Sequence, residues 1–330
     1  MRILSPLFAV VALVAAAMLA GQSQGLRMVF GVVLPYAAIA VFLAGVAWRV
    51  IRWSRAPVPF RIPTTCGQQK SLPWIKAGYL ESPSSTLGVT LRMTLEIVLF
   101  RSLFRNTRAE LRPGPRLTFG EAKFLWLGAL AFHWSFLIVF LRHLRFFMEP
   151  VPAWVVGLQA IDGFLQVGVP VLFMTDVVIL AALAYLVVRR IRDSQVRYFS
   201  LFTDYFALFL LIGLAVSGVL MRYFIRVDTI AIKQLAIGLV TFSPVVPAGI
   251  GALFFVHLAL LSVLAAYFPF SKLMHMGGVF LSPTRNLANN NRARRHVNPW
   301  NYPVKVHTYQ EWEEEFHDKI EAAGLPLERH

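Results

Sequence analysis

Long runs of apolar residues, separated by shorter polar stretches, dominate this chain of 330 residues. Each run approaches the ~20 residues that an α-helix needs to cross the hydrocarbon core of a bilayer. The pattern therefore predicts an all-α integral membrane protein with six transmembrane helices. The expected spans lie near residues 3–20, 27–48, 119–145, 169–188, 198–221 and 248–272.

The first of these runs has a second interpretation. Met1 and Arg2 precede an apolar stretch that ends in Met-Leu-Ala-Gly, which is also the pattern of a cleavable signal peptide. Either interpretation leaves the topology of the later spans unchanged.

The distribution of Lys and Arg predicts the orientation of the spans, because cytoplasmic connections are enriched in both. The connection 49–118 carries many of these residues, whereas the segment 146–168 carries none. We therefore expect 49–118 in the cytoplasm, 146–168 outside, and both termini inside, in a multi-pass protein of the cell inner membrane. The net charge of +15 then belongs to the connections, and no nucleic-acid partner is expected, since the chain has no soluble basic domain.

Composition divides the chain into four parts. Residues 1–48 hold two N-terminal transmembrane helices, 119–281 form a four-helix core, and 282–330 form a cytoplasmic arm. Between them, 49–118 is a cytoplasmic connection with one amphipathic helix, whose apolar face is expected against lipid or a partner. That face carries Leu87, Leu91, Leu95, Leu99 and Leu103.

The cytoplasmic arm contains a helix signal of its own. Thr308 and Glu311 have the spacing of a capping box, and Gly324 marks a stop, so a short helix is predicted at about 309–323. Its apolar stripe is too narrow to fold alone, and a protein partner is the expected cover. The stripe consists of Trp312, Phe316 and Ile320.

Four histidines lie in or beside the apolar segments. His133 and His143 belong to the third span, and His257 and His275 belong to the sixth. Polar groups inside a membrane are costly and usually mark function, and neutral imidazole is a common axial ligand of haem iron. Because the third span runs outward and the sixth inward, His133 pairs with His275 and His143 pairs with His257. The core is thus predicted to be a haem-binding bundle with these four metal ligands.

The spacing of the ligands requires an irregular helix. Ten helical residues rise about 15 Å and eighteen about 27 Å, so tilt and a break near Pro269 must absorb the difference. Haem b is favoured, because the chain has no Cys-x-x-Cys-His motif and Cys66 is its only cysteine. Met274 and Met276 are alternative axial ligands, and copper or zinc is a less favoured metal. The chain offers no catalytic residue, so its enzymatic activity would belong to a complex.

Three charged residues near the outer end of the bundle allow two interpretations each. Arg142 and Arg145 are candidate cofactor-binding residues that contact either a quinone or haem propionates and lipid. Asp176 either relays protons or pairs with an arginine.

Two sets of residues resemble known families. The segments Phe132-His133-Trp134 and Arg142-His143-Leu144, with His257 and His275 eighteen residues apart, resemble the haem-binding helices of the gamma subunit of respiratory nitrate reductase, over about 119–281. The extra N-terminal span, the insert 60–70 and the C-terminal arm resemble instead the DsrM-type cytochrome b family of the dissimilatory sulfite-reduction complex DsrMKJOP.

The resemblance implies a function. It implies a subunit with two haem b groups that exchanges electrons with a menaquinone-type quinone on the outer side and with a cytoplasmic iron–sulfur subunit of heterodisulfide-reductase type, in sulfur metabolism. It also implies further partners, namely a multihaem cytochrome c, an iron–sulfur protein and a second membrane subunit. The alternatives are a gamma-type cytochrome b of another respiratory oxidoreductase, and a proton or ion transporter that uses the intramembrane His and Asp residues.

Overall fold

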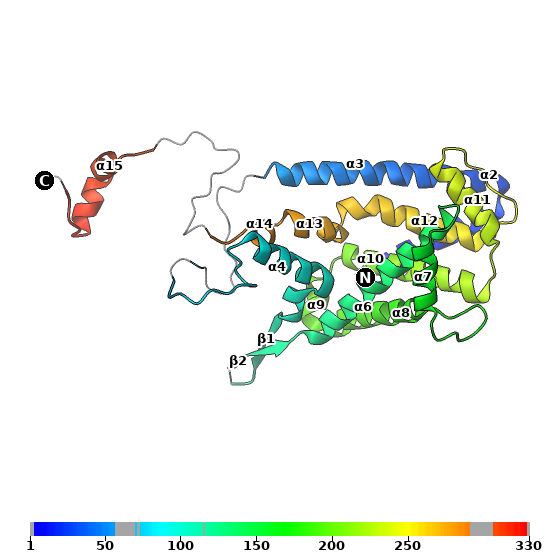
Figure 1. Cartoon of the computed structure of the whole chain (residues 1–330), viewed down its shortest axis with the longest axis horizontal. Coiled ribbons are helices and arrows are strands. Elements are labelled where there is room, and N and C mark those ends of the chain that lie inside the picture. The colour runs from blue at the N-terminus through cyan, green and yellow to red at the C-terminus, as the bar shows by residue number, and fades with distance from the viewer. Residues whose placement is uncertain (1–2, 57–69, 71–72, 115, 291–305, 329–330) are drawn as a thin grey trace.

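The protein is a bundle of long helices that run side by side (Figure 1). The computed structural model describes residues 3–56, 70, 73–114, 116–290 and 306–328. Within these ranges, five helical segments are long and apolar enough to cross a membrane, which identifies a multi-pass membrane protein. The five segments are Leu4–Gln22, Gln24–Ser54, Lys123–Phe146, Phe202–Phe224 and Ala252–Phe270.

Several of the five segments combine more than one kind of helix. The second contains a π-helical turn, the fourth ends in one, and the third and fifth end in a 3₁₀ turn. The elements are α1 (Leu4–Gln22); α2 (Gln24–Met28), the turn Val29–Val33 and α3 (Leu34–Ser54); α6 (Lys123–His143) and the turn Leu144–Phe146; α10 (Phe202–Val219) and the turn Leu220–Phe224; and α12 (Ala252–Tyr267) and the turn Phe268–Phe270.

The predicted fourth span corresponds to α8 (Met174–Arg192), which has 19 residues. It packs along α6 and α10 within the bundle. Asp176 near its start and three arginines near its end make it more charged than the five segments above. Of the six predicted spans, five correspond to these segments, and α8 is a long, more charged helix beside them.

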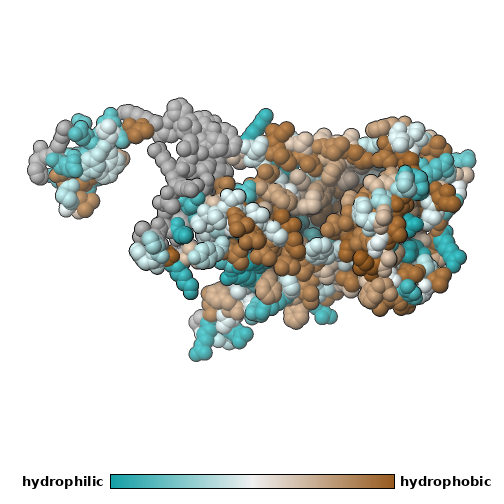
Figure 2. All heavy atoms as spheres, viewed as in Figure 1, coloured by the Kyte–Doolittle hydropathy of each residue, from teal (hydrophilic) through white to brown (hydrophobic). Residues whose placement is uncertain are grey.

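Apolar side chains cover the outside of the bundle as well as its interior. α1, α8, α10 and α12 share a buried core that includes Ala17, Leu183, Leu210 and Leu260. Large apolar side chains are also exposed around the bundle, where Figure 2 shows a broad hydrophobic surface. An apolar exterior suits a helix bundle whose solvent is lipid rather than water.

The prediction that the fold is all-α is wrong in one place. Strands β1 (Thr107–Arg112) and β2 (Arg116–Glu121) form an antiparallel hairpin ahead of α6. Apolar and polar residues alternate along both strands, so one face carries Leu111 and Leu117, which are paired and exposed. The third span consequently begins at Lys123 and not at residue 119.

Short helices lie at both ends of the bundle. The end near residues 146–168 is called the outer end below, and the opposite one the inner end, after the charge pattern of the sequence. Two helices at the outer end were not predicted, and both are apolar: α7 (Ala153–Asp162) and α11 (Thr229–Val240). The short helices at the inner end are α9 (Ser194–Phe199), α13 (His275–Leu281) and α14 (Pro283–Asn286).

The amphipathic helix predicted in the connection 49–118 is confirmed as a helix. α4 (Thr86–Leu99) begins at Ser85, whose side chain accepts a hydrogen bond from the Gly88 N–H, and it ends where Phe100 adopts a φ of 50°. A shorter helix, α5 (Arg101–Phe104), follows. The leucines at the start of α4, Leu87 and Leu91, are exposed.

The helix predicted in the C-terminal arm is confirmed as well. α15 (Tyr309–Ala322) begins with the expected capping box, in which the Thr308 side chain accepts from the Glu311 N–H and the Glu311 side chain accepts from the Thr308 N–H. It ends before Gly324, which has a φ of 65°. The insert that resembled the DsrM-type family, with Cys66, lies almost wholly outside the described residues.

Candidate functional site

The structure brings the four histidines together in two pairs. At the outer end, the ring centroids of His143 and His257 lie 6.2 Å apart, and the rings are nearly parallel at 10°. At the inner end, the centroids of His133 and His275 lie 5.8 Å apart, with the rings at 88°. We call these the outer pair and the inner pair. Their partners are those that the antiparallel order of the spans predicted.

A break in the helix lets both pairs form despite their unequal spacing. α12 ends at Tyr267, and the chain then passes through two 3₁₀ turns, Phe268–Phe270 and Lys272–Met274, before α13 begins at His275. The predicted break near Pro269 is thereby confirmed. The chain between His257 and His275 is therefore not one straight helix, and both histidines lie beside their partners on α6.

Each imidazole uses its Nδ1 atom within the protein. His133 Nδ1 lies 2.7 Å from the Ala129 carbonyl oxygen, and His143 Nδ1 lies 2.7 Å from that of Val139. Carbonyl oxygens only accept, so Nδ1 carries the proton in both rings and Nε2 keeps a free lone pair. His275 makes the same kind of contact with the Lys272 carbonyl at 2.9 Å, which leaves its Nε2 available too.

The geometry of the two pairs fits a metal held between two imidazoles. An imidazole nitrogen binds a metal at about 2.0–2.1 Å, so two rings on opposite sides of one iron have centroids roughly 6 Å apart. Both pairs have about this separation, and none of the four rings is fully buried. Among the described residues, no group of three or more His, Cys, Asp or Glu could hold a metal ion. The equatorial ligands would have to come from another molecule, as they do in haem.

Aromatic residues surround the inner pair. The Phe100 ring meets the His133 ring edge-on at 5.0 Å, and Phe132 meets it from its own helix at 5.0 Å. Phe100 is held at the end of α4, where the indoles of Trp126 and Trp134 donate hydrogen bonds to the carbonyls of two preceding residues. The end of the amphipathic helix is thus fastened to α6 beside the inner pair.

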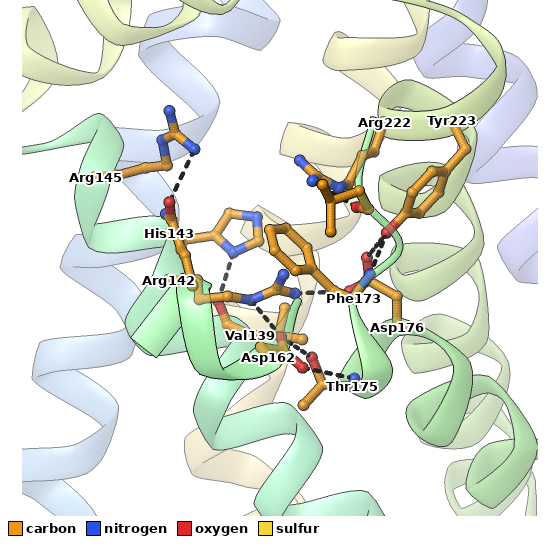
Figure 3. A network of polar contacts seen from close by, with 12 residues as sticks. Val139, Arg142, His143, Arg145, Asp162, Phe173, Thr175, Asp176, Arg222 and Tyr223 are labelled. Atoms are coloured by element: carbon orange, nitrogen blue, oxygen red, sulfur yellow. Dashed lines mark hydrogen bonds and ion pairs between the residues drawn. The ribbon is translucent and has the colours of Figure 1, made fainter. Parts of the chain in front are cut away.

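Next to the outer pair, buried charges form a network that Figure 3 shows. The Arg142 guanidinium donates a hydrogen bond to Asp176 at 2.7 Å, and its Nε lies 3.2 Å from Asp162 Oδ2. Arg142 and Asp162 are each 6% exposed, and Asp176 is 9% exposed. Thr175 donates two further hydrogen bonds to Asp162, and Tyr223 donates one to Asp176 at 2.7 Å. The network joins α6, α7, α8 and the turn Leu220–Phe224 that follows α10.

A second arginine completes this end of the bundle. Two guanidinium groups lie against the Phe173 ring. That of Arg142 is 3.9 Å from the ring centroid, and that of Arg222 is 3.8 Å from it. Arg222 also donates a hydrogen bond to the Val171 carbonyl at 2.9 Å, but among the described residues it forms no ion pair with a carboxylate. Cation–π contacts of this kind add to the cohesion of the network.

The structure separates the roles of the charged residues singled out in the sequence. Arg142 faces carboxylates, and Asp176 serves as its partner, which was one of the two interpretations of that residue. Arg145 points away from the network (Figure 3), where its guanidinium donates a long hydrogen bond of 3.3 Å to Gln159 and lies 5.7 Å from the centroid of the Phe146 ring. Arg145 therefore stays the more accessible candidate for a cofactor or quinone. Of the alternative axial ligands, Met274 is buried and Met276 is exposed.

Sequence reasoning missed several residues of this region. Asp162 and Tyr223 join the charge network only because α7 and the turn after α10 pack beside α6 and α8. No local sequence pattern therefore predicts their roles. Ser217 is a further omission: its hydroxyl lies 2.9 Å from His257 Nδ1. A small residue followed by Gly218 in an apolar helix is a weak sign of a close helix contact, and it was the only available one.

Comparison with known proteins agrees with this architecture. Residues 94–294 match the family model described as nitrate reductase gamma subunit. The chain is 49% identical over 280 residues to a protein of Archaeoglobus fulgidus named Hdr-like menaquinol oxidoreductase cytochrome b-like subunit, with 83% of each chain covered. It is 44% identical over 274 residues to the protein of the same name from Archaeoglobus profundus, with 81% of each covered. The chain belongs to the nitrate reductase gamma subunit family.

Proposed function

We propose that this protein is a membrane cytochrome b subunit that holds two haem b groups and carries electrons across the bilayer. The observation that carries the proposal is the presence of two histidine pairs, 5.8 and 6.2 Å apart between ring centroids, whose members on α6 lie ten residues apart. His143 and His257 would ligate the outer haem, and His133 and His275 the inner one. A haem held in this way would supply a one-electron carrier.

The orientation follows from the distribution of charge. We place the inner end in the cytoplasm and the outer end outside the inner membrane, with α8 as a sixth span and both termini cytoplasmic. The arginines near the end of α8 support this placement, because Arg189, Arg190 and Arg192 gather at the inner end. The charge network lies at the opposite end, where Arg142 compensates Asp162 and Asp176.

The electron donor is proposed to be a menaquinone-type quinol at the outer end. The names of the Archaeoglobus relatives support this choice, since both are called menaquinol oxidoreductase subunits. Oxidation of one quinol releases two electrons and two protons. The haems held by the two histidine pairs would supply one-electron carriers between the quinol and a cytoplasmic iron–sulfur subunit of heterodisulfide-reductase type, the proposed acceptor. Membership of a DsrMKJOP-like complex of sulfur metabolism extends this proposal.

A visible spectrum tests the central claim. The purified protein should give a reduced-minus-oxidised difference spectrum of b-type haem, and extraction of the haem should yield two per chain. A transporter that uses the intramembrane His and Asp residues would give no such spectrum. Absence of the b-type signal would therefore refute the proposal.

The exposed arginine at the outer end provides a test of the quinone site. Arg145→Ala should slow reduction of both haems by a menaquinol analogue, because a cation that can bind the quinone oxygen is lost, while the spectra of both haems stay near normal. Arg192→Ala is the matched control, since it removes an exposed arginine from the inner end of α8. Stopped-flow reduction kinetics measure the effect. Equal rates in the two variants would place the quinone elsewhere.

The C-terminal helix is the proposed anchor of the cytoplasmic partner. Trp312 on α15 is 44% exposed, and its ring lies 5.8 Å from that of Phe316. Burial of each aromatic side chain against a partner would contribute about 1.5–3 kcal/mol. We expect Trp312→Ala combined with Phe316→Ala to release the iron–sulfur subunit from membranes while both haems remain.

The control for this experiment is Asp318→Ala, which changes a fully exposed residue of the same helix. Co-purification through a salt wash measures the loss of the partner. If the double variant retains the subunit at the yield of the control, α15 is not its anchor.

A further inference from the structure

The outer pair differs from the inner pair in how its imidazoles are held. His133, His143 and His275 each bond through Nδ1 to a backbone carbonyl three or four residues earlier in the chain. His257 instead contacts a side chain on another helix: its Nδ1 lies 2.9 Å from the hydroxyl oxygen of Ser217, on α10. Two groups of α10 therefore hold this imidazole, the Leu214 carbonyl and the Ser217 hydroxyl, and the second can be replaced by substitution.

The direction of the hydrogen bond is fixed by the surroundings of the serine. The Ser217 hydroxyl oxygen also lies 3.0 Å from the Leu214 carbonyl oxygen, which can only accept. The single hydroxyl proton is donated to that carbonyl, so the Ser217 oxygen accepts the proton of His257 Nδ1. The Nε2 atom of His257 then keeps the lone pair that a metal requires.

Close packing keeps the imidazole in place. Ser217 is only 4% exposed. A Cβ atom at the next residue, Gly218, would lie 3.3 Å from His257 Cε1, so α10 approaches the ring about as closely as side-chain packing allows. The resulting orientation of His257 is nearly parallel to His143, whereas the rings of the inner pair are nearly perpendicular.

We infer that Ser217 is a positioning residue for the outer haem, which sets the ring plane of His257 and increases the electron donation of its Nε2. This inference rests on the proposed function, since it concerns a ligand of the proposed haem. A hydrogen bond accepted from the distal nitrogen of a metal-bound imidazole raises the basicity of the ligand. A more basic ligand favours ferric over ferrous iron, so Ser217 lowers the midpoint potential of the outer haem.

The two pairs should be distinguishable by electron paramagnetic resonance. In low-spin ferric haem, parallel imidazole planes give a rhombic signal, and perpendicular planes give a strongly anisotropic one. The outer pair, at 10°, is expected to give the first, and the inner pair, at 88°, the second. Each haem then reports on its own ligands.

The test compares Ser217→Ala with Ser217→Thr and Ser262→Ala in the complete, haem-loaded protein. Ser217→Ala should shift the rhombic signal and raise the midpoint potential of that haem alone, or release that haem alone. Ser217→Thr keeps the hydroxyl and should resemble the wild type. Ser262 is an equally buried serine on α12 whose hydroxyl bonds only within its own helix, to Leu258, so Ser262→Ala should leave both haems unchanged.

The possible results distinguish a failure of the role of Ser217 from a failure of the proposed function. An unchanged outer signal and potential in Ser217→Ala, or the same shift in Ser262→Ala, would overturn the role of Ser217 and leave the two haems intact. A wild-type protein without b-type haem would overturn the proposed function, and the role of Ser217 with it.

Discussion

Replacement of His143 or His257 by alanine is expected to abolish the outer haem and leave the inner one in place. Each iron would be held by one histidine from α6 and one from the α12–α13 segment, so the loss of either ligand leaves a site with a single axial bond. The inner pair is built from other residues and packs against Phe100, which the substitutions do not touch. Haem content per chain should fall from two to one.

The converse variants are the control for this prediction. His133→Ala or His275→Ala should remove the inner haem and keep the outer one, and extraction of haem together with low-temperature difference spectra identifies which one remains. Each single variant should also lose electron transfer from quinol to the cytoplasmic partner, because one step of the path is missing. Full retention of two haems in any of the four variants would refute the assignment of that histidine.

Replacement of Arg142 by methionine is expected to destabilise the outer end severely. It would leave the buried carboxylates of Asp162 and Asp176 without the cation that compensates both. Removal of one partner from a buried ion pair typically costs about 3–5 kcal/mol, because the remaining charge stays desolvated. We therefore expect a large fall in the melting temperature of the detergent-solubilised protein, measured by circular dichroism.

Two further variants separate charge from packing in this network. Arg145→Met removes the neighbouring arginine, which is exposed and weakly bonded, and should change stability by about 0.5 kcal/mol at most. The triple variant Arg142→Met, Asp162→Asn, Asp176→Asn removes all three charges and should recover most of the stability. If Arg142→Met melts at the same temperature as Arg145→Met, the network contributes little to the fold.

Sequence patterns were sufficient where a feature depends on chain order or on local chemistry. The partners of the four histidines follow from the antiparallel order of two apolar spans. The break in the sixth span follows from the missing N–H and fixed φ of Pro269, and the capped helix follows from Thr308 and Glu311. These signals are local, so tertiary contacts did not overrule them.

The features that were missed depend on contacts between distant segments. Asp162 has no distinctive sequence neighbours and gains its role only when α7 places it against Arg142. Ser217 gains its role only when α10 meets α12. The hairpin was concealed because Leu117 and Phe119 look like the start of an apolar span, although their alternation with Thr118 and Gly120 is the pattern of a strand.

The contrast between α6 and the broken α12–α13 path has a consequence for the proposed electron transfer. α6 is one unbroken helix from Lys123 to His143, so its two proposed ligands lie about 15 Å apart along the helix axis. The rate of electron tunnelling falls exponentially with distance, and an inserted helical turn between these ligands would add about 5 Å. On the other side of the pairs, residues 268–274 form two 3₁₀ turns instead of a continuous α-helix. Under the proposed function, the ten-residue interval of α6 between His133 and His143 therefore sets the spacing of the two haems on that side.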